Sequence, residues 1–179
     1  MDSDVDLNNV PYEVGLGEAQ PEAPSCPFCL IAEGKIEAKI VYSDDRFLGI
    51  LDINPANLGH ILLFPKFHYV SLAGMSDDLA SSMFVTAKKL CAVLVETLHA
   101  KGFNIFLAEG QVAGQNVPHI LLHLIPRYDQ DGLSFFWKAK SLSEDEMKNV
   151  ADLIKSFSFK KEEPAEQYFF EFDEEERIA

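Results

Sequence analysis

The chain has 179 residues, of which 47% are hydrophobic and 11% aromatic, so it can bury a normal core and is not disordered throughout. Its net charge is −14, but the acidic excess lies in the first 24 and the last 18 residues, on either side of a nearly neutral body. The lack of a basic stripe argues against duplex DNA or an anionic membrane as the main partner.

Export and membrane insertion are not expected either. The start of the chain has neither the basic nor the apolar region of a signal peptide, and no apolar run approaches the roughly 18–20 residues that span a bilayer. The odd, low number of cysteines (Cys26, Cys29 and Cys91) argues against a disulfide framework. We therefore expect a soluble, cytoplasmic protein.

The first 24 residues are rich in proline, glycine and acids, and are expected to be disordered. After them, hydrophobic periodicity and turn residues predict a short helix over 28–34, strands over 39–43, 47–53 and 60–65, a long helix over 76–100, strands over 104–108 and 118–125, and a last helix to about Phe157. The expected fold class is α+β, with a five-stranded antiparallel sheet, one long packing helix and a C-terminal helix.

The two longer helices carry recognisable start and stop signals. Ser76 can cap the long helix, and Gly102 suits its stop. The last helix opens at Ser141 or Ser143, and Ser141-x-x-Glu144 has the pattern of a capping box. The expected domain organisation is an acidic extension over 1–24, one domain over 25–158, and an acidic, aromatic tail over 159–179.

The stretch from Cys26 to Cys29 is a C-x-x-C pair, in which both thiols can reach one tetrahedral metal ion. Such a pair alone is compatible with zinc or with redox chemistry, although the βαβ start of a thioredoxin-like fold is absent. Zinc needs two further ligands, and histidine is their natural source. His99 is set aside because it falls at the end of the long helix, where a surface cation suits the helix dipole. The remaining candidates are His60, His68, His119 and His123.

The predicted fifth strand carries two histidines on one face. Because side chains alternate along a strand, His119, Leu121 and His123 point one way and the intervening apolar residues point the other. The two histidines are either buried and held by hydrogen bonds or part of a site. The glycine-containing loop over 110–116 precedes them, so a phosphate could lie between its N–H groups and this face, although ordinary turns use the same residues.

Three stretches together resemble the histidine-triad (HIT) family, especially its zinc-containing bacterial and archaeal branch. They are CPFCLIAEGKI, IVYSDDRFLGILDINPANLGHILLFPKFHY and GQVAGQNVPHILLHLIPRY, and DGLSFFWK adds a weaker match. Their order and spacing run from about Cys26 to Lys138. The resemblance implies a HIT-like fold, binding of a purine nucleoside phosphate, and a homodimer formed through the helix Ser76–Ala100 and the neighbouring strand.

The resemblance also implies two sets of site residues. In zinc-containing members, both cysteines, the histidine of the P-K-x-H-Y segment and the first triad histidine hold a structural zinc, which here are Cys26, Cys29, His68 and His119. The nucleotide site would use an apolar base pocket, a carboxylate on the ribose hydroxyls and donors at the phosphate. In that order these are Pro27, Phe28, Ile31, Ile50 and Ile53; Asp52; and Gly114, Gln115, Asn116 and His123.

The chain departs from the family's pattern at three positions. The triad reads His-φ-His-φ-His, and its middle histidine attacks phosphorus, but that position is Leu121 here, which has no lone pair. Ala108 stands where the family has an asparagine, and Asn116 where serine or threonine is usual. His119 would be committed to zinc, and His123 lies about 6–7 Å further along the strand, so neither is expected to replace the nucleophile.

The sequence therefore predicts a nucleotide-binding relative of nucleoside phosphoramidate and dinucleotide hydrolases whose catalysis is lost or crippled at Leu121. Two alternatives stay open: an active hydrolase or nucleotidyl transferase, as for the parent of a His-to-Leu variant, and a non-catalytic protein-interaction module that acts through its dimer surface or acidic tails. His60 is assigned a minor supporting role near the active face. Arg127 is either a phosphate contact or a solvated strand end.

Overall fold

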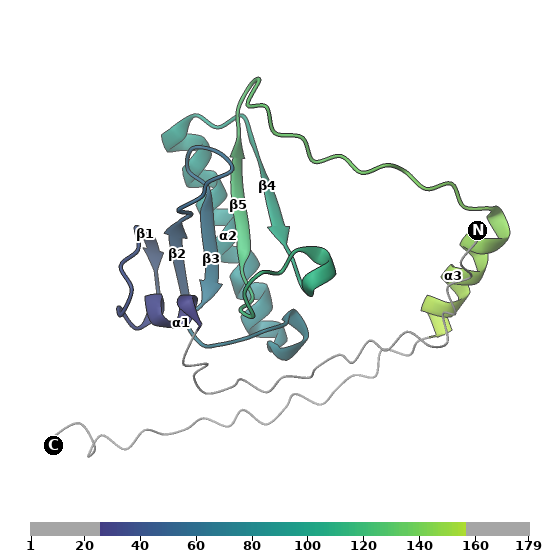
Figure 1. Ribbon diagram of the computed structural model, residues 1–179, viewed down its shortest axis with the longest axis horizontal. Helices are drawn as coiled ribbons and strands as arrows, with labels where there is room; N and C mark the ends of the chain where they lie inside the picture. The colour runs from purple at the N-terminus through teal and green to yellow at the C-terminus, as the bar shows by residue number, and fades with distance from the viewer. Residues whose placement is uncertain (1–25, 157–179) are drawn as a thin grey trace, which may run out of the picture. The chain divides into compact units, whose positions relative to one another are not determined.

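The computed structural model describes residues 26–156, which divide into two compact units after Leu133 (Figure 1). The predicted extension 1–24 and tail 159–179 lie outside the described residues, and the predicted limits of the domain 25–158 stay a prediction. None of the helices in the described part of the chain combines the length and the hydropathy that a membrane-spanning helix requires.

The first unit is a five-stranded antiparallel sheet with the strand order β1-β2-β3-β5-β4 and one long helix, α2, packed along it (Figure 1). The predicted α+β class is therefore confirmed. Two short 3₁₀ turns, η1 (Leu72–Gly74) and η2 (Gln111–Ala113), lie in the connections. The helices and strands of this unit are α1 (Pro27–Ala32), β1 (Ile40–Ser43), β2 (Phe47–Leu51), β3 (Ile61–Pro65), α2 (Asp77–Leu98), β4 (Gly102–Leu107) and β5 (Leu122–Arg127).

Alternation along the central strands separates two hydrophobic clusters, one on each face of the sheet. On one face, residues such as Leu63 of β3 and Leu122 of β5 pack against the buried stripe of α2. On the other face, Leu62 and Phe64 of β3 pack with Phe28 of the short helix α1. The second cluster therefore ties the start of the described chain to the face that carries the candidate site.

The long helix begins as predicted and ends differently. The Ser76 hydroxyl accepts a hydrogen bond from the Leu79 N–H at 3.3 Å, as an N-cap does. The helix ends at Leu98, and His99 takes the left-handed conformation (φ 55°) that Gly102 was expected to supply. Gly102 instead opens β4. An isolated histidine tolerates this conformation better than a β-branched residue does, so the prediction placed the stop too late.

The fifth strand starts four residues later than predicted, at Leu122, and continues through Pro126 to Arg127. The ladder with β3 covers only Leu122 to Leu124. Upstream of it the chain is held locally, because the Ile120 N–H donates to Tyr69 O at 2.6 Å. Pro126 is tolerated because β3 no longer flanks the strand there and only β4 pairs with it.

The second unit contains the helix α3 (Glu144–Ser156). Its capping box is Ser143 with Glu146: the Glu146 N–H donates to the Ser143 hydroxyl at 3.3 Å, and the Glu146 carboxylate accepts from the Ser143 N–H at 2.7 Å. The predicted box at Ser141 and Glu144 is therefore wrong by two residues. The true pair has the same spacing, which is why the pattern alone was ambiguous.

Candidate metal centre and pocket

The two cysteines and two histidines of the predicted metal site come together from three segments of the chain. Cys26 and Cys29 lie at the start of α1, His68 follows β3, and His119 precedes β5. All four side chains are buried, and their ligand atoms lie within 4.8 Å of one another. The group could therefore hold a metal ion.

The distances within this group fit a tetrahedral ion. The Nδ1 atom of His119 lies 3.4 Å from Cys26 Sγ and 3.7 Å from Cys29 Sγ, and His68 Nδ1 lies 3.3 Å from Cys29 Sγ. Zinc–sulfur and zinc–nitrogen bonds of about 2.3 and 2.0–2.1 Å at tetrahedral angles place sulfur and nitrogen ligands about 3.6 Å apart. The donor set and its spacing thus suit zinc.

Hydrogen bonding and burial prepare these side chains as ligands. The His119 Nε2–H donates to Pro65 O at 3.0 Å, which leaves the Nδ1 lone pair facing the thiols. Burial lowers the pKa of His119 to about 4 and also lowers the pKa of His68, so both rings are neutral. Burial, followed by the neighbouring Cys26, raises the pKa of the Cys29 thiol to about 12. A divalent cation would offset that cost by stabilising the thiolate.

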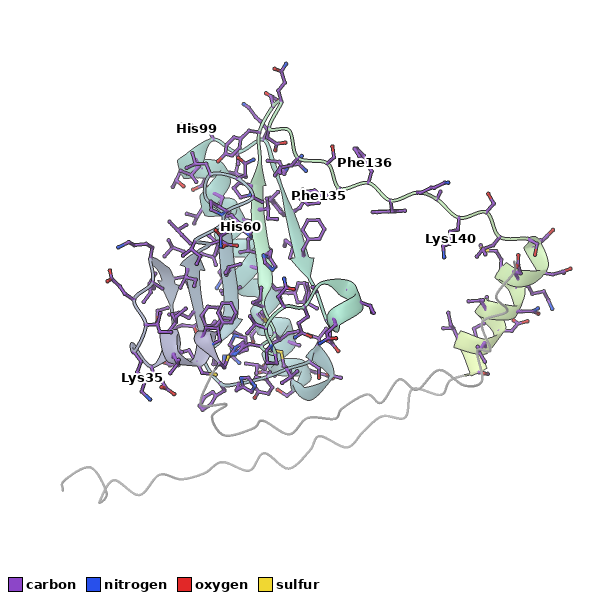
Figure 2. The ribbon with its side chains drawn as sticks, viewed as in Figure 1. Lys35, His60, His99, Phe135, Phe136 and Lys140 are labelled. Carbon is purple, nitrogen blue, oxygen red and sulfur yellow. The ribbon has the colours of Figure 1, made fainter. Side chains whose placement is uncertain are left out.

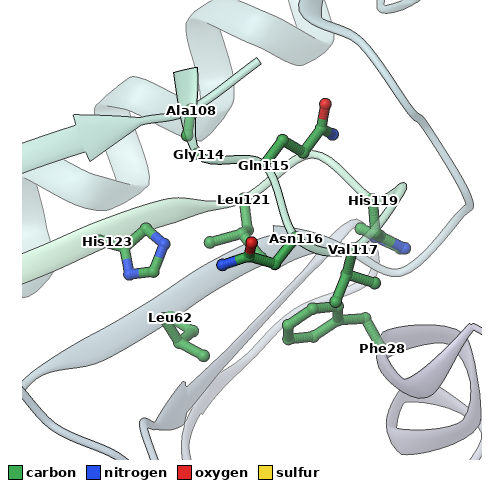
Figure 3. Close-up of a pocket in the computed structure, with 10 residues that line it drawn as sticks. All are labelled: Phe28, Leu62, Ala108, Gly114, Gln115, Asn116, Val117, His119, Leu121 and His123. Carbon is green, nitrogen blue, oxygen red and sulfur yellow. The ribbon is translucent and has the colours of Figure 1, made fainter. Parts of the chain in front are cut away.

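A cavity of about 140 Å³ lies beside this cluster (Figure 3). His119 belongs both to the metal-ligand cluster and to the pocket wall. Phe28 of the wall packs on the His119 ring with a centroid distance of 5.6 Å. The wall of the pocket is mostly apolar, and none of its residues is an acid, a lysine or an arginine. They are Phe28, Leu62, Ala108, Gly114, Gln115, Asn116, Val117, His119, Leu121 and His123.

The predicted two faces of the histidine segment are confirmed. The cluster beneath α2 fully buries Ile120, Leu122 and Leu124. His119, Leu121 and His123 instead line the pocket on the opposite side. Figure 3 shows the Leu121 side chain in the pocket between the two histidines. A hydrocarbon therefore occupies the middle of the polar side of the pocket.

The loop before β5 is bonded chiefly to itself and to the segment after β3. Gly110 and Gly114 have φ angles of 83° and 97°, which glycine adopts without strain. The Gln115 side chain accepts from the Gly110 N–H at 2.8 Å and donates to Val70 O at 2.9 Å. In Figure 3 Gln115 points away from His123, whereas Asn116 extends into the pocket toward it. Asn116 is thus the amide of this loop that faces a ligand.

A chain of hydrogen bonds fixes the proton positions of His60 and His123. The Ala56 N–H donates to His60 Nδ1 at 3.1 Å, so His60 carries its proton on Nε2 and donates it to His123 Nδ1 at 3.1 Å. His123 then carries its own proton on Nε2. Burial lowers the pKa of both rings, and the nearby Asp52 only partly opposes this, so both are neutral.

His60 lies in the middle of this hydrogen-bond chain, and its predicted supporting role stays a prediction. It is 4% exposed within the first unit, whereas His99 lies exposed at the end of α2, as expected (Figure 2). Asp52 Oδ2 lies 3.4 Å from His60 Nδ1, and these two residues with His123 gather potential metal ligands within 4.8 Å. The hydrogen-bond chain already uses three of the four ring nitrogens, which favours a polar network over a second metal site.

The pocket unites some of the predicted nucleotide residues and leaves others apart. Phe28, Gly114, Gln115, Asn116 and His123 line it. The others, Pro27, Ile31, Ile50, Asp52 and Ile53, do not belong to its wall. Ile53 is 90% exposed and Ile50 is buried in the cluster beneath α1, so neither offers a surface to this cavity. Their assignment to a base site stays a prediction.

Two pocket residues were not predicted, and one candidate is engaged elsewhere. Leu62 and Val117 line the cavity; the alternation of the third strand was the available signal for Leu62. Arg127 binds Asp131, with its Nε donating at 2.7 Å, and also donates to Asn104 and Leu133 O. Arg127 therefore braces the end of β5 and is neither a phosphate contact of this pocket nor a simply solvated strand end.

Comparison with known proteins identifies the family. The model of the HIT domain matches residues 33–130. An uncharacterised HIT-like protein of Methanocaldococcus jannaschii is 44% identical over 123 residues, which cover 68% of this chain and 95% of that protein. The adenosine 5'-monophosphoramidase HNT1 of Candida albicans is 32% identical over 136 residues, which cover 73% of this chain and 90% of that enzyme.

The structural comparison agrees with the sequence comparison. The crystal structure of a zinc-bound histidine triad family protein from Mycobacterium smegmatis matches with a TM-score of 0.61 and 35% identity, over 76% of this chain and 100% of that one. The domain match spans more than half of the chain, and the five-stranded antiparallel sheet with one long packed helix agrees with the fold that the resemblance implied. The chain belongs to the HIT family.

Proposed function

We propose that this HIT protein binds a purine nucleoside phosphate and hydrolyses it slowly or not at all, because Leu121 occupies the place of the nucleophile. Asp52 would hold the ribose hydroxyls, and Asn116 and His123 would face the phosphate. The observation that carries the proposal is the position of Leu121 in the pocket wall between His119 and His123.

Attack on phosphorus needs a lone pair beside the phosphate, and the pocket offers no ring nitrogen that can supply one. Both nitrogens of His119 are engaged, Nε2 by Pro65 O and Nδ1 by the thiols. The Nδ1 atom of His123 accepts from His60, and its Nε2 atom carries a proton. His123 can therefore donate to a phosphate oxygen or a leaving group but cannot form a covalent nucleotidyl intermediate.

The test compares hydrolysis of an adenosine phosphoramidate by the unsubstituted chain and by Leu121→His. A phosphoramidate is the appropriate substrate because the Candida albicans relative is an adenosine 5'-monophosphoramidase. We expect a rate near background for the natural chain. Leu121→His should raise it by orders of magnitude, since removal of a nucleophile lowers turnover by up to roughly 10⁶-fold.

Two further variants control for this comparison. Leu121→Asn is polar and of similar size but has no nucleophile, so it should stay near background. Leu121→His combined with Ala108→Asn should exceed Leu121→His alone, because the amide can position the phosphate or the new ring. Brisk turnover by the unsubstituted chain would overturn the proposal, and millimolar or absent binding of purine nucleosides and nucleotides alike would favour an interaction module.

The proposal has three further parts. Cys26, Cys29, His68 and His119 hold a structural zinc, which the donor set and the 3.3–3.7 Å spacing support. The chain forms a homodimer through α2 and β4, and it works in the cytoplasm. Metal analysis of protein purified without added metal should find about one zinc per chain, and protein purified without bound metal would contradict the zinc site.

A further inference from the structure

Two hydrocarbon side chains replace polar groups at the phosphate end of the pocket. Leu121 stands where the family has its nucleophile, and Ala108 where it has an asparagine; both line the cavity. Neither side chain can donate a hydrogen bond to a phosphate oxygen. The part of the wall that should meet the charged end of a nucleotide has therefore become largely apolar.

The loop that should cradle the phosphate uses several of its donors within itself. The N–H groups of Ala113, Gly114 and Gln115 all donate to carbonyl oxygens of the same loop, at 3.0–3.2 Å. The Gly110 N–H and the Gln115 amide are bonded to each other, and Gln115 also donates to Val70 O. Among the side chains that line the pocket, Asn116 and His123 are the ones left to meet an anion.

The electrostatic setting does not compensate for these losses. The wall contains no lysine or arginine, and burial lowers the pKa of His123, so its ring is neutral rather than cationic. The body of the chain between its acidic ends is nearly neutral, so no excess of basic residues draws an anion to the pocket. A phosphate dianion must give up its hydration to enter, and neutral donors without a cation replace only part of it.

The apolar end of the pocket keeps its binding surface. Phe28, Leu62 and Val117 line it, and Phe28 is fixed against Phe64 and the His119 ring at centroid distances of 4.9 and 5.6 Å. A flat purine can pack on such a wall without any charged contact. Base and sugar can therefore supply the affinity that the phosphate no longer supplies.

We propose that the pocket selects the neutral purine nucleoside, so that adenosine or guanosine binds at least as tightly as its 5'-monophosphate. This inference rests on the proposed function, because it presumes that the pocket binds a purine. It adds that the 5'-phosphate makes no net contribution to affinity. The nucleotide can still bind, but its affinity comes from the base and the sugar.

Calorimetric titration of the full-length, zinc-loaded chain with adenosine, AMP, guanosine and GMP, at one fixed salt concentration, tests the inference. For the base that binds, the Kd of the monophosphate should equal or exceed that of the nucleoside. A monophosphate that binds tenfold or more tightly than its nucleoside would overturn the inference and leave the proposed function standing. Absence of binding by all four ligands would instead overturn the proposed function.

Restoring the polar groups should reverse the preference. Leu121→His combined with Ala108→Asn is expected to lower the Kd of the monophosphate by tenfold or more and to leave the Kd of the nucleoside within about twofold. His99→Gln, at the exposed end of α2, is the matched control and should change neither. Equal gains for nucleoside and nucleotide in the double variant would contradict the inference. If the double variant does not fold, the comparison of ligands on the natural chain still decides.

Discussion

His60 and His123 illustrate how single residues define the chemistry of this pocket. His60 cannot donate to His123 unless its own proton is on Nε2, and the Ala56 N–H enforces that tautomer. The same constraint makes His123 a donor toward the cavity. Leu121 has no lone pair, so the position between the two histidines would offer no nucleophile to a phosphorus atom. Under the proposed function, these three residues would leave the pocket able to bind a ligand but not to attack it.

The buried histidines also predict how stability depends on pH. The pKa of His119 falls from 6.5 to about 4 on folding, and the pKa values of His60, His68 and His123 are lowered in the same direction. Between pH 6.5 and about 4 the unfolded chain therefore binds more protons than the folded chain, and the free energy of unfolding of metal-free protein must fall as the pH falls. His119 alone accounts for about 3 kcal/mol.

Urea unfolding of chelator-treated protein at several pH values between 7 and 4 measures this dependence. We expect a falling unfolding midpoint across the window. His99→Gln should have the same profile as the natural chain, because His99 is exposed. A midpoint that stays constant down to pH 4 would show that these rings are not held neutral in the folded protein.

Among the elements, α1 connects the candidate metal site to the pocket. It is six residues long, and it carries Cys29 toward the metal cluster and Phe28 into the pocket wall. A helix this short is marginal on its own, so its position depends on these two attachments. Loss of the metal should therefore release Phe28 and weaken purine binding.

The comparison of Cys29→Ser with Cys91→Ala tests this coupling. Cys29→Ser removes a proposed zinc ligand and should lower both the zinc content and the affinity for a purine ligand, the latter by tenfold or more. Cys91→Ala removes a cysteine that is buried beneath α2 and should keep both. Unchanged purine affinity after complete removal of zinc would show that α1 holds its place without the metal.

The elements also show what could be predicted from the sequence. Local signals were sufficient for the α2 stripe, the Ser76 cap and the two faces of the histidine segment, because each depends on residues close in the chain. The start of β5 could not be predicted, because it is set by the Ile120 N–H bonding to Tyr69 O. The engagement of Arg127 by Asn104 likewise depends on a pairing between distant segments.

At the scale of the whole molecule, the sheet order places β4 at one edge and β1 at the other. An exposed sheet edge invites pairing with another chain unless it is protected. Phe103 of β4 and Phe84 of α2 are each 46% exposed, although large aromatic residues gain most from burial. These two elements therefore carry the surface through which the proposed homodimer would form.

Light scattering coupled to gel filtration can test the homodimer directly. The natural chain should show twice the chain mass of 20.0 kDa, and Phe84→Glu or Phe103→Glu should shift it toward the single-chain mass, because a buried, unpaired carboxylate in the interface is costly. Val41→Glu is the matched control, since Val41 is 47% exposed but lies on β1 at the opposite edge. It should leave the mass unchanged. A single-chain mass for the natural protein, or dimers that survive both aromatic substitutions, would place the interface elsewhere or remove it, and the pocket would then have to be complete within one chain.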